Sequence, residues 1–211
     1  MLDKNILLIN KPRGLSSAQA VSQIKKIYGV KKAGHAGTLD KEAEGLLIIG
    51  LDQATKKLAD YQKMAKEYQV KIKLGIKTET DDLSGKILQT RSIKEINLGK
   101  IKKALKTFLG KTQQRPPIYS AVKIKGKPAY KLARKGKTVK LKRKTVTLIK
   151  AKISQFEPPY LSLVMKTSKG FYVRSFARDL GEKLGCGAAT ARIIRTAIGP
   201  YDLEKASRIK I

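Results

Sequence analysis

Apolar and polar residues follow one another along the chain in the patterns of both strands and helices. Residues 5–10 (NILLIN) and 45–51 (GLLIIGL) are continuous apolar runs, which is typical of buried strands. Residues 81–85 (DDLSG) predict a turn, after which residues 86–90 are expected to pair back on the preceding strand. Apolar and polar side chains alternate, as in half-buried strands, in residues 67–74, 145–149 and 160–167.

Apolar positions three or four residues apart predict three helices. Ser16 or Ser17 can cap the first and Asn97 the second, while Gly185 stands at the C-terminus of the third. The mixture of strands and helices predicts an α+β fold with a mostly antiparallel sheet, and no linker divides residues 1–211, which are expected to form one domain. The apolar faces of the helices are predicted to consist of Val21, Ile24 and Tyr28; of Leu98, Ile101, Leu105 and Phe108; and of Phe176, Leu180 and Leu184.

The net charge narrows the class of partner. Lys and Arg number 47 against 16 Asp and Glu in 211 residues, a formal net charge of +31. Such a charge favours nucleic acid over a membrane, because no basic amphipathic helix stands out, and a salt-adapted surface is the alternative. No acid lies between Glu95 and Glu157, where 19 Lys or Arg fall. We interpret residues 121–144, the densest part, as a partly ordered arm whose cations contact phosphates.

Cysteine and histidine are too few for a disulfide or for a typical zinc site. The one cysteine, Cys186, excludes an intramolecular disulfide, and the one histidine leaves little for a zinc site. The apolar run at the N-terminus is too short for a signal or membrane-spanning segment. We therefore expect a soluble, cytoplasmic protein without a metal and, as the simpler assumption, a monomer.

Residues 34–45 (GHAGTLDKEAEG) place the only histidine, His35, five residues before Asp40. Considered alone, an aspartate after a glycine-rich loop is more often a turn former or a helix cap, and a lone histidine is more often structural. The motif gains a chemical meaning only from the other segments of the chain.

Six segments of the chain carry a further signal. They are NKPRGLSS (10–17), KAGHAGTLDKEAEGLLIIGL (32–51), KEYQVKIKLGIKTETDDLSG (66–85), QRPPIYSAVKIKGKPAYKLARKG (114–136), SKGFYVRSFARDLGEKLGCGA (168–188) and IIRTAIGPY (193–201). In this order they resemble the TruB family of tRNA pseudouridine synthases, which act on the uridine at position 55 of the tRNA T arm. The resemblance implies the pseudouridine synthase fold, the tRNA T stem-loop as partner and no cofactor. It also implies that residues 119–144 form a basic, thumb-like RNA-binding insertion. Many members continue into a C-terminal PUA domain, for which nothing remains after Ile211, so a short form is expected.

The resemblance makes Asp40 the catalytic carboxylate. Pseudouridylation breaks the N1–C1′ glycosidic bond, turns the uracil and joins C5 to C1′, without redox change or hydrolysis. The carboxylate can attack C1′ or take a proton from C2′ to give a glycal, and both routes stay open. Arg174 matches the arginine that pairs with this aspartate, and a guanidinium fixes the rotamer of a carboxylate. Tyr68 matches the tyrosine that stacks on the target base.

The resemblance also implies a set of RNA-binding residues. His35 is expected to contact the extruded uridine rather than to act as an acid or base, and Gly34 and Gly37 let the backbone approach the RNA. Lys41 stands where the family usually has proline, which leaves the stiffness of the loop open. The remaining expected residues are Lys11 and Lys123, for phosphate contact or loop support, Arg134 in the insertion, and Tyr172 and Ile193 lining the pocket.

Three other functions stay open at this point. An RNA chaperone would bind and refold tRNA with weak or no catalysis. A catalytic subunit of a guide-RNA particle is a second possibility, although such relatives carry the C-terminal domain. A structural ribosome-associated protein would explain the charge, but it gives no reason for Asp40, Arg174 and Tyr68 together.

Overall fold

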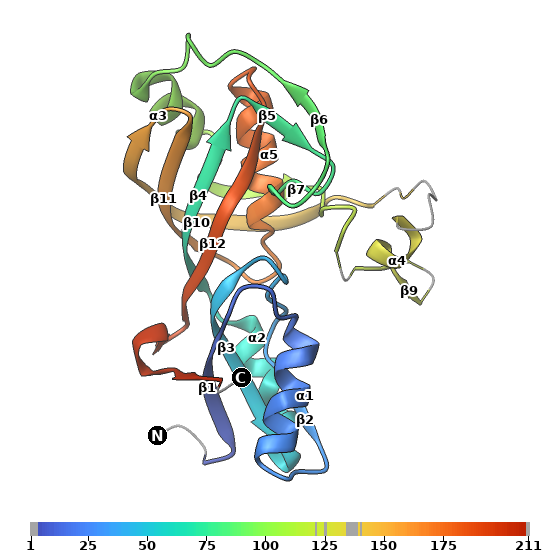
Figure 1. Ribbon diagram of the computed structural model, residues 1–211. Helices are drawn as coiled ribbons and strands as arrows, with labels where there is room; N and C mark the ends of the chain where they lie inside the picture. The colour runs from blue at the N-terminus through green and yellow to red at the C-terminus, as the bar shows by residue number, and fades with distance from the viewer. Residues whose placement is uncertain (1–3, 121, 125, 134–138, 140, 210–211) are drawn as a thin grey trace. The chain divides into compact units, whose positions relative to one another are not determined.

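The computed structural model describes residues 4–120, 122–124, 126–133, 139 and 141–209 (Figure 1). The helices are α1 (Ser17–Ile27), α2 (Leu58–Lys63), α3 (Leu98–Lys106), α4 (Ala129–Ala133) and α5 (Val173–Lys183), with 3-10 turns η1 (Asp52–Lys57) and η2 (Leu203–Lys205). The strands are β1 (Ile6–Lys11), β2 (Ala33–His35), β3 (Glu44–Leu51), β4 (Lys66–Leu74), β5 (Ile76–Thr78), β6 (Ile87–Thr90), β7 (Gly110–Gln114), β8 (Lys123–Ile124), β9 (Lys127–Pro128), β10 (Lys144–Glu157), β11 (Tyr160–Thr167), β12 (Ala188–Ile198), β13 (Tyr201–Asp202) and β14 (Ser207–Arg208).

The large sheet is mixed. Its strand order is β14-β1-β3-β12-β4-β11-β10-β7, with β13 on β12 and β2 on β3. The pairs β1–β14 and β3–β12 are parallel, whereas β1–β3, β2–β3, β12–β13 and β7–β10 are antiparallel. The predicted α+β class is confirmed, and the sheet combines antiparallel with parallel pairs.

The chain divides into two compact units, each assembled from separate stretches. Unit 1 comprises Met1–Gln69, Val164–Lys169 and Arg192–Ile211, and unit 2 comprises Val70–Leu163 and Gly170–Ala191. Strands β4, β11 and β12 contribute residues to both units. That the whole chain forms one domain stays a prediction.

Strand β3 is the centre of the core of unit 1, as its apolar run predicted. Leu47 and Ile49 pack with Ile24 of α1, and α1 lies beside β1 and β3 (Figure 1). On the opposite face, Ile48 packs with Leu58 of α2. Alternate residues of one strand thus face two apolar layers, which explains why the run is continuous rather than alternating.

The ends of the helices agree with the predicted caps, but two inward positions were wrong. Ser16, not Ser17, caps α1, in a capping box with Gln19. Asn97 caps α3. Tyr28 is the C-cap of α1 and is 51% exposed, and Leu98 is the first residue of α3 and is 43% exposed. Both stand at helix ends, where the apolar stripe no longer faces the core.

Unit 2 contains the other two predicted helices and the predicted strands at residues 86–90 and 145–149. Strand β6 pairs back on β5, as expected, and β10 is longer than the predicted strand at residues 145–149. Phe108 and Phe176 meet edge to face at 5.4 Å between ring centroids. Of the predicted insertion, the described part contains β8, β9 and α4. Within the described residues, no helix is long and apolar enough to cross a membrane.

Candidate active site

Asp40 lies in the loop of residues 36–43, which joins β2 to β3 in unit 1. Its side chain is half-buried. The loop turns at Gly37, whose φ of +91° lies in the region that favours glycine, and Ala36 N–H donates to the Ile48 carbonyl at 2.9 Å. The loop has no regular secondary structure, so its conformation depends on bonds to its neighbours.

Lys11, at the end of β1, supports this loop from inside the protein. The residue is fully buried, and its Nζ donates to the carbonyl oxygens of Pro12, Leu15 and Ala43 at 2.8, 2.6 and 2.6 Å. Three acceptors match the three hydrogens of an ammonium group. Burial and then the charge of Arg195 lower the pKa of Lys11 to about 8.

Arg195 of β12 lies under the same loop. It is 2% exposed; its Nε donates to Leu46 O at 2.7 Å, and its two terminal nitrogens reach Thr38 O at 3.4 Å and Gly37 O at 3.2 Å. The backbone of Arg195 can approach β3 this closely because its partner in the register is Gly45, with φ +110°. A Cβ at Gly45 would collide with the Arg195 backbone.

Arg195 also links the loop to Tyr68, the buried first residue of the predicted inward face of β4. The two side chains are hydrogen-bonded, and both lie within electrostatic reach of Asp40. Burial raises the pKa of Tyr68, and the Arg195 guanidinium opposes this rise. Burial lowers the pKa of Arg195, while Tyr68 and Asp40 oppose that change. Unit 1 therefore contains Asp40, Tyr68, Lys11 and Arg195 as one electrostatic group.

His35 and Lys66 lie at the margin of this group. Burial and then the charge of Arg195 lower the pKa of His35, which is half-buried. Lys66 is buried and donates to Gln62 O at 2.5 Å and to Met64 O at 2.7 Å. Its pKa is lowered to about 8, first by burial and then by Arg195. The lowered pKa favours the neutral imidazole, and the expected role of His35 in binding the uridine stays a prediction.

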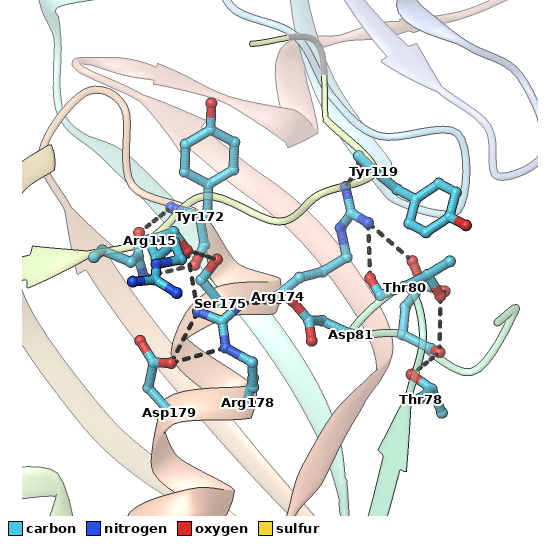
Figure 2. A network of polar contacts seen from close by, with 12 residues as sticks. Thr78, Thr80, Asp81, Arg115, Tyr119, Tyr172, Arg174, Ser175, Arg178 and Asp179 are labelled. Atoms are coloured by element: carbon cyan, nitrogen blue, oxygen red, sulfur yellow. Dashed lines mark hydrogen bonds and ion pairs between the residues drawn. The ribbon is translucent and has the colours of Figure 1, made fainter. Parts of the chain in front are cut away.

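In unit 2, Arg174 lies at the start of α5 in a dense set of polar contacts (Figure 2). Its side chain donates to Thr80 O and Tyr119 O, each at 2.9 Å, and forms an ion pair with Asp82 at 3.4 Å. Oδ1 of Asp82 in turn accepts from Thr80 Oγ1 at 2.7 Å and from Ser84 Oγ at 2.6 Å. Both charged side chains are buried, so the arginine is held in one orientation.

Two further side chains of α5 bind the same two segments, those around residues 80 and 115. Ser175 Oγ and Arg178 donate to Arg115 O at 2.8 and 3.0 Å, and Arg178 pairs with Asp81 and Asp179 at 2.9 Å each (Figure 2). Burial raises the pKa of Asp81, and Arg178 opposes the rise. One helix thus fixes the segments around residues 80 and 115 through three polar side chains, those of Arg174, Ser175 and Arg178.

The predicted site residues fall into both units. Unit 1 holds Asp40, Tyr68, His35, Gly37, Lys11 and Ile193, and unit 2 holds Arg174, Tyr172 and Lys123. Ile193 is 7% exposed and Tyr172 is half-buried. Lys123 begins β8, and Arg134 lies outside the described residues. The pairing of Asp40 with Arg174 joins the two units and stays a prediction. Among the described residues, no group of His, Cys, Asp or Glu could hold a metal ion.

Sequence reasoning missed Arg195, Asp82 and Gln114. Arg195 lies in the strand AATARIIRTAI, where small, apolar and charged residues are mixed and the alternation is obscured because an arginine points inward. Asp82 was assigned only to a turn. Gln114 is 3% exposed at the end of β7; it begins the segment 114–136 that resembles the family, but its residue type alone indicated no role.

The fold is that of pseudouridine synthases. The chain superimposes with a TM-score of 0.74 on a chain of a Cbf5–Nop10–Gar1 complex, at 27% identity, covering 97% of this chain and 52% of that one. A chain from an H/ACA ribonucleoprotein bound to a substrate RNA containing 2′-deoxyuridine gives 0.71 at 24% identity, with 96% and 50% covered. The second likeness concerns the fold alone.

Residues 25–173 match the family described as TruB family pseudouridylate synthase (N terminal domain), and this chain belongs to that family. A tRNA pseudouridine synthase B of Burkholderia pseudomallei is 43% identical over 201 residues, covering 95% of this chain and 66% of that protein. Those of Colwellia psychrerythraea and Syntrophus aciditrophicus are 42% identical, covering 95% of this chain and 63% and 64% of theirs. The chain thus spans just under two thirds of the length of these relatives.

Proposed function

We propose that this protein isomerises uridine to pseudouridine in tRNA, at position 55 of the T arm, with Asp40 as the catalytic carboxylate. The observation that carries the proposal is the placement of Asp40: a half-buried carboxylate on a loop tied to two buried cations, Lys11 and Arg195, beside Tyr68. Family membership and the similarity to tRNA pseudouridine synthases B support the reaction and tRNA as the substrate.

The residues of unit 1 would have different roles in the reaction. Lys11 and Arg195 attract the Asp40 carboxylate and hold its loop, so that the carboxylate meets C1′ or the C2′ proton of an extruded uridine without reorganising. Tyr68 offers an aromatic face to the base, and its hydroxyl is oriented by Arg195. Lys11 acts here by supporting the loop, since its ammonium hydrogens all have carbonyl acceptors.

Arg174 of unit 2 would complete the site as the partner of Asp40, and Tyr172 would line the pocket of the base. The support for Arg174 is its fixed orientation: Thr80, Tyr119 and Asp82 hold the guanidinium (Figure 2). The net charge of +31 suits a polyanionic partner, with affinity that falls steeply as salt rises.

The test is incubation of the protein with an unmodified tRNA transcript, followed by mapping of pseudouridine. We expect one product at position 55 without guide RNA, and none from the Asp40→Asn variant, which should still bind tRNA. Product only in the presence of a guide RNA would instead indicate a particle subunit. Refolding of tRNA by the wild type without any product would indicate a chaperone.

A further inference from the structure

Hydrogen bonds to its backbone carbonyls fix the conformation of the loop that carries Asp40, because a residue with a restricted φ, such as proline, does not follow Asp40. Lys41 follows Asp40 and, unlike a proline, does not fix its own φ. Yet Lys41 O accepts from Gly14 N at 2.8 Å, and Asp40 O accepts from Ala43 N at 3.1 Å. Together with the carbonyls of Gly37 and Thr38, which accept from Arg195, and of Ala43, which accepts from Lys11, these bonds fix the loop on both sides of the carboxylate.

Leu39, directly before Asp40, is held by one side chain. Ser17 Oγ donates to Leu39 O at 2.8 Å and accepts from Leu39 N at 2.8 Å. A single hydroxyl thus satisfies both backbone polar groups of the residue next to the carboxylate. Ser17 is 3% exposed and Leu39 is 4% exposed, so water cannot replace the hydroxyl without opening the packing.

The adjacent residues Ser16 and Ser17 form different hydrogen bonds. Ser16 caps α1, with its Oγ accepting from Gln19 N at 3.2 Å, at an exposed position. Ser17 takes no part in the cap and turns its hydroxyl to the loop. The cap stabilises the helix, whereas the second hydroxyl acts on the residue that precedes the carboxylate.

We propose that Ser17 is a positioning residue for the reaction: through Leu39 it holds the Asp40 carboxylate at the sugar of the extruded uridine. The inference rests on the proposed function. A loss of this bond frees the Leu39 peptide to rotate, and small displacements of a reacting group cost large factors in rate. Substrate binding is not affected, because Ser17 is buried.

The experiment compares Ser17→Ala with Ser16→Ala, with pseudouridine formation in a tRNA transcript as the readout. We expect Ser17→Ala to lower kcat about tenfold or more with KM unchanged, and to lower the hydrogen-exchange protection of the Leu39 amide. Ser16→Ala should lower the melting temperature and leave kcat of the folded protein at the wild-type value. Equal kcat for Ser17→Ala and wild type, or equal losses in the two variants, would overturn the proposal.

A second variant tests the role of Ser17 if Ser17→Ala does not fold. Ser17→Cys keeps the side-chain shape with a weaker donor and acceptor, so its kcat should fall about threefold or more at unchanged KM. A wild-type kcat in Ser17→Cys would overturn the proposal. Absence of product from both the wild type and Ser16→Ala would instead reject the proposed function itself.

Discussion

The side-chain amide of Gln114 binds both backbone polar groups of Tyr172. Its Oε1 accepts from Tyr172 N at 2.8 Å and its Nε2 donates to Tyr172 O at 2.9 Å. Tyr172 is the N-cap residue of α5 and has no side-chain cap of its own, so the end of β7 orients the start of the helix that carries Arg174.

Replacing Gln114 by Leu should therefore destabilise the protein by about 2 kcal/mol, because two backbone groups lose their partners in a buried place. Gln113→Leu is the matched control: its amide donates to Thr145 Oγ1 at an exposed position, and its loss should cost less than about 0.5 kcal/mol. Urea unfolding of both variants measures the difference, and equal values would contradict the role of Gln114.

Arg195→Lys should lower the free energy of unfolding by about 2–3 kcal/mol and reduce pseudouridine formation. Lysine keeps the charge but cannot reach the carbonyls of Gly37, Thr38 and Leu46 together with Tyr68. Arg192→Lys, three residues earlier, changes only an exposed ion pair with Glu44 and should stay within about 0.5 kcal/mol of the wild type. Wild-type stability in Arg195→Lys would show that the guanidinium fork is dispensable.

Gly45→Ala should cost at least about 2 kcal/mol, since the new Cβ meets the Arg195 backbone at a φ of +110°. Gly29→Ala separates the cost of the steric collision from the cost of the positive φ. Gly29 also has a positive φ, +62°, but open space around it, so only the conformational cost of about 1 kcal/mol should appear. Thermal unfolding compares the pair. A smaller loss at Gly45 than at Gly29 would refute the close approach of β12 to β3.

Asp82→Asn should weaken the hold on Arg174. The amide oxygen can still accept from Thr80 and Ser84, but the charge that faces the guanidinium is lost, at a cost of about 2–3 kcal/mol. We expect kcat to fall. In the control Glu79→Gln, a carboxylate that accepts from Tyr119 Oη at an exposed position is changed, and kcat should remain. Kinetics on a tRNA transcript distinguish the two, and unchanged kcat in Asp82→Asn would argue against orientation of Arg174 by this carboxylate.

Lys66 should make stability depend on pH in the alkaline range. Its pKa falls from 10.5 to about 8 on folding, so between these values the unfolded chain binds more protons than the folded one. The free energy of unfolding contributed by Lys66 therefore rises with pH from about 8 to about 10.5. Denaturant titrations at several pH values should therefore show that the free energy of unfolding of the wild type, relative to that of Lys66→Met, rises across this window. A constant difference would mean that the pKa of Lys66 is not lowered.

The local patterns of the sequence were sufficient for most of the elements. The alternation in residues 67–74 predicted that Tyr68, Val70, Ile72 and Leu74 face inward, and all four are buried. The apolar run at residues 45–51 and the cap at Asn97 were likewise confirmed. Such features depend on neighbours a few residues apart, whose contacts follow from the geometry of a strand or helix.

Only the tertiary structure decided which polar side chains are interior. The sequence by itself determined the α+β class, the basic surface and the candidate role of Asp40, because composition, periodicity and motif are properties of the chain alone. It could not show that Lys11 and Arg195 are buried beneath residues 36–43. Lys11 donates to the distant carbonyl of Ala43 as well as to two nearby ones, and all the carbonyls that accept from Arg195 are far away in the chain. Every residue offers the same carbonyl, so no side-chain pattern marks those that receive a cation; folding alone selects them.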